Sequence, residues 1–521
     1  MNRPAAFVVL IFAACGVGLA LRLPELNLRP MHVDEAVHAC KFDTLWTTGR
    51  YEYNPAEYHG PTLYYLTLPA VWLSAADDFA HVDVTPFRMV TVVFGIGLIL
   101  LLLLVADGLG RPATACAALL AAISPALAYY SRYYIQEMLL VFFTFLVIAA
   151  GWRYRQTRHW PWAMLAGASV GLMHATKETC VIALGCMAAA LLLTVLWQRR
   201  SGVKSSLGVY VRPWAIIGAM AAAVVVSVVF FSGFFTNASG PLDSVRALAT
   251  YWGRAGGGGV HEHPWYYYLH MLTYWRAGAG PIWSEGLIVA LGLVGIVAAL
   301  TGRGLAAGAR GLARFLAIYT ILMTLIYSAI PYKTPWCMLS ALQALTVLGG
   351  IGAVALVGVV RHPAARTVVM GLLLAAGVQL AWQARRANSL KYCANERNPY
   401  VYAHTLYSAA DLAAQLENLA RVAPDGHHLL IKVMVENCWP LPWYLRRFDR
   451  VGYWETVPDQ PDADVILASS TLQSALEPRL KGVYQVNTRA LRRDERLMVY
   501  IRQDVWDAYI EHMLRAPAVR S

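Results

Sequence analysis

Two adjacent carboxylates, Asp34 and Glu35, stand between two histidines in the stretch from Met31 to His38. They follow a long apolar segment almost directly, so we expect them close to the place where that segment ends. A carboxylate in such a position can serve as a general base, and a pair of acids beside histidines can also ligate a metal ion. A solvated pair of loop acids is the structural alternative. These two residues are the first candidates for catalysis.

Single cations stand in three short turns between apolar segments. Arg132 lies five residues before Glu137, and either the two form an ion pair or Arg132 binds a phosphate, which suits its planar guanidinium. Lys177 precedes Glu178, so a pair of neighbours, or a lysine that extends to the membrane interface, competes with a ligand-binding role. Lys333 lies in a non-helical turn between two prolines, where an aromatic loop is the alternative. We take Arg132, Glu137, Lys177 and Lys333 as candidate contacts to a donor phosphate or substrate.

Three histidines in two loops form a further candidate group. His59 precedes a Gly-Pro pair, whereas His261 and His263 flank Glu262. Histidines with nearby acids can make a site for a metal ion, although exposed histidines are more often ordinary surface residues. We therefore expect no certain cofactor, leave a divalent metal open, and count the three histidines among the substrate-binding candidates.

Long apolar runs must position these residues. The chain has 521 residues and is 58% hydrophobic but only 14% charged, whereas a soluble domain carries about 25% charged residues. Runs of about 18 or more apolar residues recur as far as residue 384, and each can cross a bilayer core of roughly 30 Å. The sequence thus predicts a polytopic α-helical membrane protein with about eleven spans. These lie near 4–22, 86–106, 112–131, 137–152, 161–176, 179–197, 214–235, 284–302, 313–330, 337–360 and 366–384.

The loops between these spans carry unequal charge. Alternate loops hold arginine and lysine with a single acid, Asp107, whereas the other loops mix acids with bases. The positive-inside rule makes the basic loops cytoplasmic, so the candidate residues and the C-terminus are expected on the non-cytoplasmic side of the membrane. Many of the basic residues behind the net charge of +12 lie in these short loops, so we expect no nucleic-acid partner.

Two loops on that side are long, and a separate domain follows the last span. The first loop covers 23–85 and includes a short semi-apolar stretch with two prolines, which favours interfacial helices over a further span. The second covers 236–283 and contains a glycine run at 256–259. Near the C-terminus, short β runs alternate with helical segments, which is typical of a small soluble α/β domain. We therefore divide the chain into a membrane domain, 1–384, and an outer-face domain, 390–521.

Acids and cations are thus expected on one membrane face. A carboxylate base with several cations suits attack by a hydroxyl on a carbon with a linked phosphate, because the cations stabilise the leaving phosphate. The membrane favours a donor whose phosphate lies at the lipid interface, such as a polyprenyl-phosphate-linked sugar, with a glycan, lipid or protein as acceptor. The alternative is a non-catalytic or accessory component of lipid-linked glycan flipping or export, although the sequence lacks the paired broken helices typical of transporters.

Six motifs in the membrane domain belong together by family resemblance. They are His32–Ala39, Glu57–Pro61, Tyr130–Arg132, Thr176–Glu178, Pro264–Tyr268 and Tyr332–Trp336. With these motifs the chain resembles GT-C-fold glycosyltransferases of the protein-mannosyltransferase-like superfamily over roughly residues 1–384. More narrowly, it resembles the group named for a flippase-associated protein of archaeal N-glycosylation clusters, which also has bacterial members.

The resemblance implies roles for individual residues. An acid in the first outer loop is the expected base of the superfamily; it falls on Asp34, and the second acid of that motif falls on Glu35. A further active-site acid falls on Glu137, where the more usual aspartate is absent. The donor is typically a polyprenyl-phosphate sugar, and transfer usually inverts the anomeric centre. The resemblance therefore implies a hexosyl or pentosyl transferase of the cell membrane, and the loop charges predict that it acts on the non-cytoplasmic side.

Overall fold

The computed structural model describes residues 4–56, 59–202, 212–255 and 261–515. Its internal contacts divide the chain into two compact units. The first unit comprises Met1–Leu26, Thr44–Ala70 and Phe87–Tyr402, and the second comprises Asn27–Asp43, Val71–Pro86 and Ala403–Ser521. Two segments of the first loop thus belong to the same unit as the C-terminal sheet. The glycine run at 256–259 and the motif residues Glu57 and Tyr58 lie outside the described residues.

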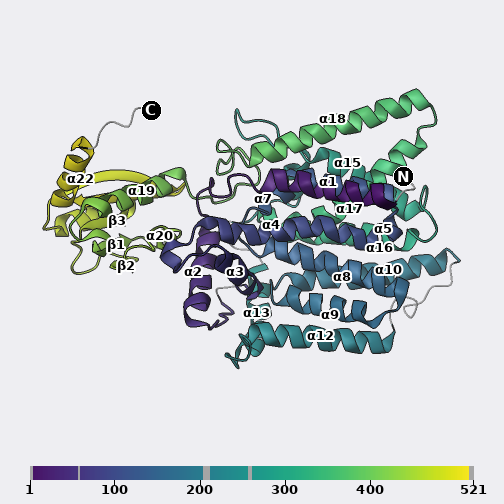
Figure 1. Ribbon diagram of the computed structural model, residues 1–521, viewed down its shortest axis with the longest axis horizontal. Helices are drawn as coiled ribbons and strands as arrows, with labels where there is room; N and C mark the ends of the chain where they lie inside the picture. The colour runs from purple at the N-terminus through teal and green to yellow at the C-terminus, as the bar shows by residue number, and fades with distance from the viewer. Residues whose placement is uncertain (1–3, 57–58, 203–211, 256–260, 516–521) are drawn as a thin grey trace. The chain divides into compact units, whose positions relative to one another are not determined.

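Long helices dominate the first unit, and a described helix lies at each of the eleven predicted spans (Figure 1). Eight of the described helices are long and apolar enough to cross a membrane. The eleven helices are α1 (Pro4–Arg22), α4 (Val84–Leu101), α6 (Arg111–Ile123), α8 (Glu137–Thr157), α9 (Trp160–His174), α10 (Cys180–Arg200), α12 (Pro213–Phe231), α15 (Gly286–Thr301), α16 (Arg310–Ala329), α17 (Leu339–Val359) and α18 (Pro363–Ala387). The prediction of a polytopic helical membrane protein is confirmed.

Small residues let these helices pack closely. α15 lies against α17, and a methyl group on Gly352 of α17 would lie 1.9 Å from the carbonyl oxygen of Leu291 on α15. Lipid tails are as apolar as the helices themselves, so such close backbone contact, rather than hydrophobic burial, holds membrane helices together. The result is a tight frame from which the connecting turns project.

Shorter elements occupy the connections of this unit. α7 (Pro125–Tyr130) follows α6, α13 (Gly240–Ala255) follows α12, and α14 (Tyr267–Thr273) precedes α15. α3 (Thr62–Leu73) has 12 residues and therefore a length of about 18 Å, too short to cross a bilayer. Because successive long helices run in opposite directions, the turns after α9 and α16 lie at the same end of the bundle as α7 and α13 (Figure 1).

The second unit is built on a five-stranded mixed sheet of order β2-β1-β3-β5-β4. β1 (Ile431–Met434) pairs in parallel with β2 (Val451–Trp454) and with β3 (Val465–Ser469). β5 (Glu495–Arg502) pairs antiparallel with β3 and with β4 (Tyr484–Arg492). The predicted α/β character of the C-terminal domain is confirmed; β2 is a strand that the sequence did not reveal.

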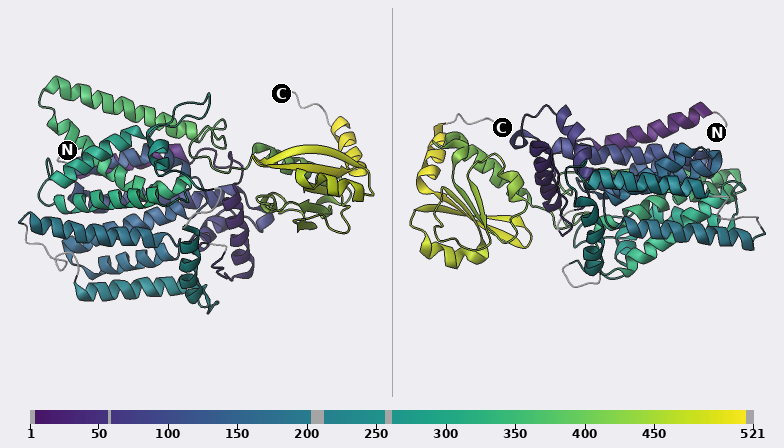
Figure 2. Two further views of the ribbon diagram at one scale, coloured as in Figure 1. Left: turned by 180° about the vertical axis from the view of Figure 1, so that it is seen from behind. Right: turned by 90° about the horizontal axis from the view of Figure 1, so that it is seen from below.

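Helices cover both faces of this sheet (Figure 2). α19 (Tyr407–Val422) and α22 (Gln503–Arg515) pack on one face through Leu412, Leu416 and Val505. On the other face, Ile466 and Leu476 belong to a smaller apolar cluster. β3 is buried at every position because it is central and covered on both sides, as expected for a strand between two layers. α2 (Val33–Thr48), which carries the paired acids, begins in this unit.

Candidate active site

Glu35 lies in the first turn of α2 and is fully buried. Its Oε1 lies 2.9 Å from Nη2 of Arg29 in an ion pair, and its Oε2 accepts a hydrogen bond of 3.1 Å from the backbone N–H of His32. An acid that binds the N–H groups of a helix start is favoured by the helix dipole. The carboxylate of Glu35 is therefore occupied in fixing the start of α2.

Asp34, one residue earlier, has a different environment. Its side chain is 42% exposed, and its Oδ2 lies 3.9 Å from Nδ1 of His32. The backbone N–H of Asp34 donates to the same Nδ1 at 3.0 Å, so in neutral His32 the ring proton is on Nε2. The geometry thus separates the two acids: Glu35 is internal, and Asp34 presents a carboxylate to its surroundings.

The turn after α9 packs against the segment that begins α3. The N–H of Thr62 donates to the carbonyl oxygen of Ala175 at 3.1 Å, and the hydroxyls of Thr62 and Thr176 lie 2.7 Å apart. A Cβ on Gly60 would lie 2.1 Å from the Ala175 oxygen, so a side chain cannot be accommodated there. The His-Gly-Pro motif and the Thr-Lys-Glu motif of the sequence are therefore one structural feature.

Glu178 is the polar centre of that feature. Its Oε2 lies 2.7 Å from Nδ1 of His59, and its Oε1 accepts a hydrogen bond of 2.9 Å from the hydroxyl of Tyr53. Burial raises the pKa of a carboxyl, but His59 and Tyr53 outweigh this effect and hold the pKa of Glu178 below its ordinary value. Glu178 is thus a buried anion.

Lys177 forms an ion pair with Glu137 at the start of α8, and both side chains are buried. From the sequence, the structural alternatives were a pair with the neighbouring Glu178 or an extension to the membrane interface, whereas the structure shows an ion pair with a residue 40 positions away. Both charges also act electrostatically on the thiol of Cys337, which follows the turn of Lys333. The turns before α10 and before α17 are therefore close to one another.

Lys333 lies in a turn that pairs with the histidine loop. Its N–H donates to the carbonyl oxygen of His261 at 2.9 Å, and the N–H of His263 donates to that of Pro331 at 3.2 Å. Nζ of Lys333 donates to the carbonyl oxygens of His263, at 3.1 Å, and Ile330. The side chain is 1% exposed, and burial lowers the pKa of its ammonium group. Carbonyl oxygens are neutral, so these hydrogen bonds do not cancel the positive charge of the ammonium group.

The histidines of this loop are in contact with tyrosines. Nδ1 of His261 lies 2.6 Å from the hydroxyl of Tyr402, and the ring of His263 stacks on Tyr267 with centroids 4.2 Å apart. Burial, together with the charges of His261 and Lys333, lowers the pKa of His263. Among the described residues, no three His, Cys, Asp or Glu side chains gather in an arrangement that could hold a metal ion.

Arg132 is buried in the turn before α8. Its Nη2 donates to the carbonyl oxygen of Glu25 at 2.8 Å, just after α1. The adjacent Tyr133 contacts Trp336 with ring centroids 5.7 Å apart, and Trp336 also contacts Tyr402 at 5.9 Å. An aromatic cluster therefore joins the turn of Arg132 to that of Lys333. Within the first unit, the structure brings the turns of Arg132, Lys177 and Lys333 to one end of the bundle.

Several residues of this region were not singled out by the sequence. Glu285 is fully buried and accepts hydrogen bonds from the Ala126 N–H at 2.7 Å and from the hydroxyls of Ser124 and Tyr400. It holds the start of α7, and its one signal in the sequence is an acid directly before an apolar span. Tyr53 was visible only as one of many loop aromatics. Their partners are distant in sequence, so no local spacing identifies them.

The helical bundle with its elaborated first loop and a small C-terminal sheet domain defines the GT-C fold of membrane glycosyltransferases. The protein is an integral membrane protein of this fold, as the sequence predicted. A family profile described as dolichyl-phosphate-mannose-protein mannosyltransferase matches residues 66–239. No curated protein matches the sequence significantly.

Solved structures of the same fold align with nearly the whole chain. ArnT from Cupriavidus metallidurans in the apo state has 16% identity and a TM-score of 0.63, with 96% of this chain and 99% of that chain covered. The structure of the same protein bound to undecaprenyl phosphate has 16% identity to this chain and a TM-score of 0.62, with the same coverage. A third structure is that of archaeal oligosaccharyltransferase AglB from Archaeoglobus fulgidus in complex with an inhibitory peptide and a dolichol-phosphate. It has 10% identity and a TM-score of 0.58, and the alignment covers 98% of this chain and 77% of AglB.

These likenesses establish the fold. The superfamily resemblance is supported by the family profile and by these structures, whereas the narrower resemblance to the flippase-associated group stays a prediction. The chain covers almost all of ArnT, including its C-terminal region, so the likeness extends beyond the membrane helices.

Proposed function

We propose that this protein transfers a hexosyl or pentosyl unit from a polyprenyl-phosphate donor to an acceptor on the non-cytoplasmic face of the cell membrane. The observation that carries the proposal is the contrast between Asp34 and Glu35. The Glu35 carboxylate is engaged by Arg29 and by a helix N–H, whereas the Asp34 side chain is 42% exposed beside His32. A carboxylate that lies beside a histidine and is open to a ligand can serve as a general base.

In this proposal Asp34 removes the proton from the acceptor hydroxyl. The acceptor oxygen then bonds to the anomeric carbon as the bond between that carbon and the phosphate oxygen breaks, and both electrons of the broken bond leave with the polyprenyl phosphate. Attack from the face opposite the phosphate inverts the anomeric centre. The proton ends on Asp34 and then passes to solvent.

Cations stabilise the leaving group in this proposal. The negative charge that develops on the leaving phosphate is stabilised by preorganised donors, and in many enzymes such stabilisation lowers the barrier more than any other effect. We assign this role to Arg132, Lys177 and Lys333, with His59, His261 and His263 as further substrate contacts. Lys333 supports the assignment best, because its ammonium is held by backbone carbonyls and gains a counter-charge when a phosphate arrives.

Two of the structural relatives bear on the donor class. ArnT has been solved with undecaprenyl phosphate, and AglB with a dolichol-phosphate and a peptide. A polyprenyl-phosphate donor for this chain is consistent with both. The non-cytoplasmic placement rests on the arginine-rich alternate loops and the positive-inside rule.

A reconstituted assay tests this function. The full-length protein is placed in lipid nanodiscs with polyprenyl-phosphate-linked hexose or pentose carrying a radiolabelled sugar, together with a membrane extract as acceptor source. The expected result is time-dependent loss of labelled donor with release of the polyprenyl phosphate and label in the acceptor fraction. Tight binding of donor without turnover under any condition contradicts an enzyme and favours an accessory role in lipid-linked glycan flipping or export.

A further inference from the structure

One short segment of the C-terminal domain contacts both parts of the first loop that belong to its unit. This is the 443–447 segment, Trp-Tyr-Leu-Arg-Arg, which overlaps the end of α20 (Leu441–Tyr444). Its partners lie in 27–43, which carries Asp34, and in 71–86. No sequence motif marked the segment, and the chemistry proposed above makes no use of it.

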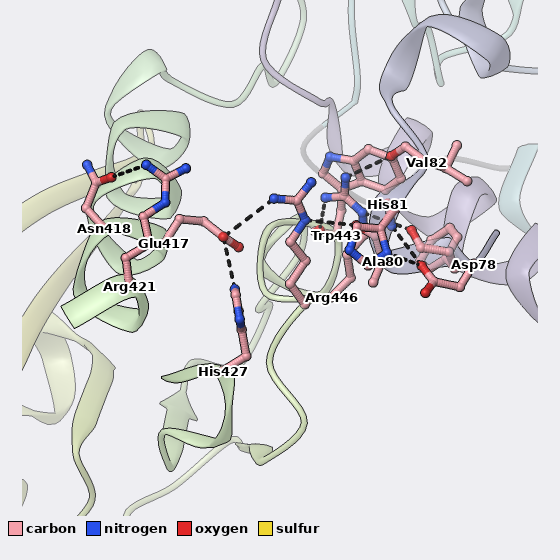
Figure 3. A network of polar contacts seen from close by, with 12 residues as sticks. Asp78, Ala80, His81, Val82, Glu417, Asn418, Arg421, His427, Trp443 and Arg446 are labelled. Carbon is pink, nitrogen blue, oxygen red and sulfur yellow. Dashed lines mark hydrogen bonds and ion pairs between the residues drawn. The ribbon is translucent and has the colours of Figure 1, made fainter. Parts of the chain in front are cut away.

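Two arginines of the segment bind backbone carbonyls of the loop. Nε and Nη2 of Arg446 donate to the carbonyl oxygens of Phe79, at 3.2 Å, and Val82, at 2.9 Å. Nε of Arg447 donates to that of Ala80 at 3.0 Å. Figure 3 shows the Arg446 side chain directed at this stretch of the loop. A planar guanidinium can bind two carbonyls in a fixed geometry, which makes it a clamp and not only a charge.

Aromatic contacts and an internal ion pair hold the segment itself in place. The guanidinium of Arg446 lies 3.8 Å from the ring centre of Trp443, and that ring meets Phe79 edge-on at 5.6 Å. Nη1 of Arg447 lies 3.5 Å from the carboxylate of Glu417 on α19, which also binds His427 at 3.1 Å (Figure 3). The segment is therefore anchored to the helical layer of the sheet domain.

The same segment reaches the turn of the proposed base. The backbone N–H of Met31 donates to the hydroxyl of Tyr444 at 2.9 Å, three residues before Asp34. The next residue, His32, accepts from the Asp34 N–H, and its ring lies 4.8 Å from that of His404, which is also buried. Tyr444 and His404, both of the C-terminal domain, thus contact the residues that immediately precede Asp34.

We propose that the 443–447 segment is a positioning element for catalysis: it sets the place of the Asp34 carboxylate, and the C-terminal domain is thereby part of the catalytic apparatus. The inference rests on the proposed function, in which Asp34 is the base. Tyr444 and Arg446 act through the loop and not on the substrate. A base that is displaced by a fraction of an ångström loses rate without loss of donor affinity, because alignment matters in the transition state more than in the bound state.

The test uses Tyr444→Phe in the full-length protein, a change that removes one hydroxyl and keeps the ring. We expect kcat to fall about tenfold while the KM for donor remains that of the wild type. Loss of one hydrogen bond costs about 1 kcal/mol, so the unfolding temperature should fall only slightly, as in the control described next. Amide hydrogen exchange of a peptide covering 29–36 should become faster. Arg446→Lys should keep part of the rate that Arg446→Ala loses, since lysine can still donate to one carbonyl.

Tyr484→Phe is the matched control in the same domain. Its hydroxyl donates to Oδ1 of Asp462 at 3.0 Å and accepts from the N–H of Ala463 at 3.2 Å, both within the sheet domain. Its loss should lower the stability of the domain and leave kcat and the exchange of 29–36 unchanged. If Tyr484→Phe lowers kcat as much as Tyr444→Phe does, the effect is one of domain stability and the proposal is wrong.

The outcomes separate this inference from the proposed function. Wild-type kcat in Tyr444→Phe, with Asp34→Asn inactive, overturns the positioning role and leaves the function intact, whether or not exchange at 29–36 changes. If the wild-type protein transfers no sugar, the proposed function fails and the catalytic inference fails with it. The exchange measurement then still shows whether Tyr444 holds the turn at Met31.

Discussion

Nδ1 of His59 lies 2.7 Å from Oε2 of Glu178. The two residues are 119 positions apart in the chain, and each belongs to a different sequence motif. Their contact joins the entry to α3 with the turn between α9 and α10, so the two motifs that carry His59 and Glu178 are parts of one polar framework at one end of the helical bundle.

The His59–Glu178 contact should make stability depend on pH. The pKa of Glu178 is held below its ordinary value in the folded protein, so its ionised form contributes stability above the unfolded-state pKa of about 4.3, and this is lost as the pH falls through the lower folded-state pKa. We expect His59→Ala to destabilise the protein by about 1–3 kcal/mol near pH 7. Thermal unfolding in detergent from pH 3 to 7 should show this difference shrinking toward acid; a gap independent of pH would exclude ionised Glu178 as its cause.

The Lys177–Glu137 pair allows a structural role to be separated from a functional one. Lys177→Met leaves a buried carboxylate without its partner, which costs about 3–5 kcal/mol for a buried pair. The double variant Lys177→Met/Glu137→Gln removes both charges and should recover most of that stability. If Lys177 also binds the donor phosphate, the double variant stays deficient in transfer. Recovery of both stability and full activity would show that the pair is only structural.

Lys333 should control the alkaline limb of the reaction. Burial lowers the pKa of its ammonium group, so this cation is lost at a lower pH than an ordinary lysine with a pKa of about 10.4. We expect kcat/KM for donor to fall as the pH rises through the lowered pKa of Lys333. Lys333→Arg should keep activity to higher pH, because arginine stays charged. The profile is measured in nanodiscs at saturating acceptor. Identical alkaline limbs for wild type and Lys333→Arg would remove Lys333 from donor binding.

Gly60 tests the framework sterically. A methyl group there would lie 2.1 Å from the Ala175 carbonyl oxygen, so Gly60→Ala must push the α9–α10 turn away from the α3 entry. We expect a loss of about 2 kcal/mol or more and a large fall in activity, because Lys177 and Glu178 move with that turn. The control is Gly16→Ala in α1, where the new methyl meets nothing within 4 Å. Equal stability of the two variants would contradict the packing described here.

The sequence predicted the helical framework because long apolar runs and loop charges report directly on membrane crossing. It also located the turns that carry Arg132, Lys177 and Lys333. The sequence could not predict which side chains form ion pairs. Lys177 pairs with Glu137, 40 positions away, because the fold of the turn, and not proximity in sequence, decides which side chains meet. The sequence did not predict β2, because a four-residue strand with a glycine shows little alternation of apolar and polar residues.

The link between the first loop and the C-terminal domain could not be predicted either. Met31 and Tyr444 are 413 residues apart, and the bond between them uses a backbone N–H, which leaves no trace in residue type. The distinct surroundings of Asp34 and Glu35 are likewise a product of tertiary structure. Adjacent residues in the first turn of a helix point in different directions, so one acid can be buried while its neighbour is exposed.

The most direct test of the account is the rate of sugar transfer by Asp34→Asn in the reconstituted system. Asp77→Asn, the same change at an exposed acid of the same loop, is the control. If Asp34 is the general base, kcat falls by about 10²–10⁴-fold while donor binding and thermal stability persist, and Asp77→Asn behaves as the wild type. Full activity of Asp34→Asn would contradict the central claim, because an amide cannot take the proton from the acceptor.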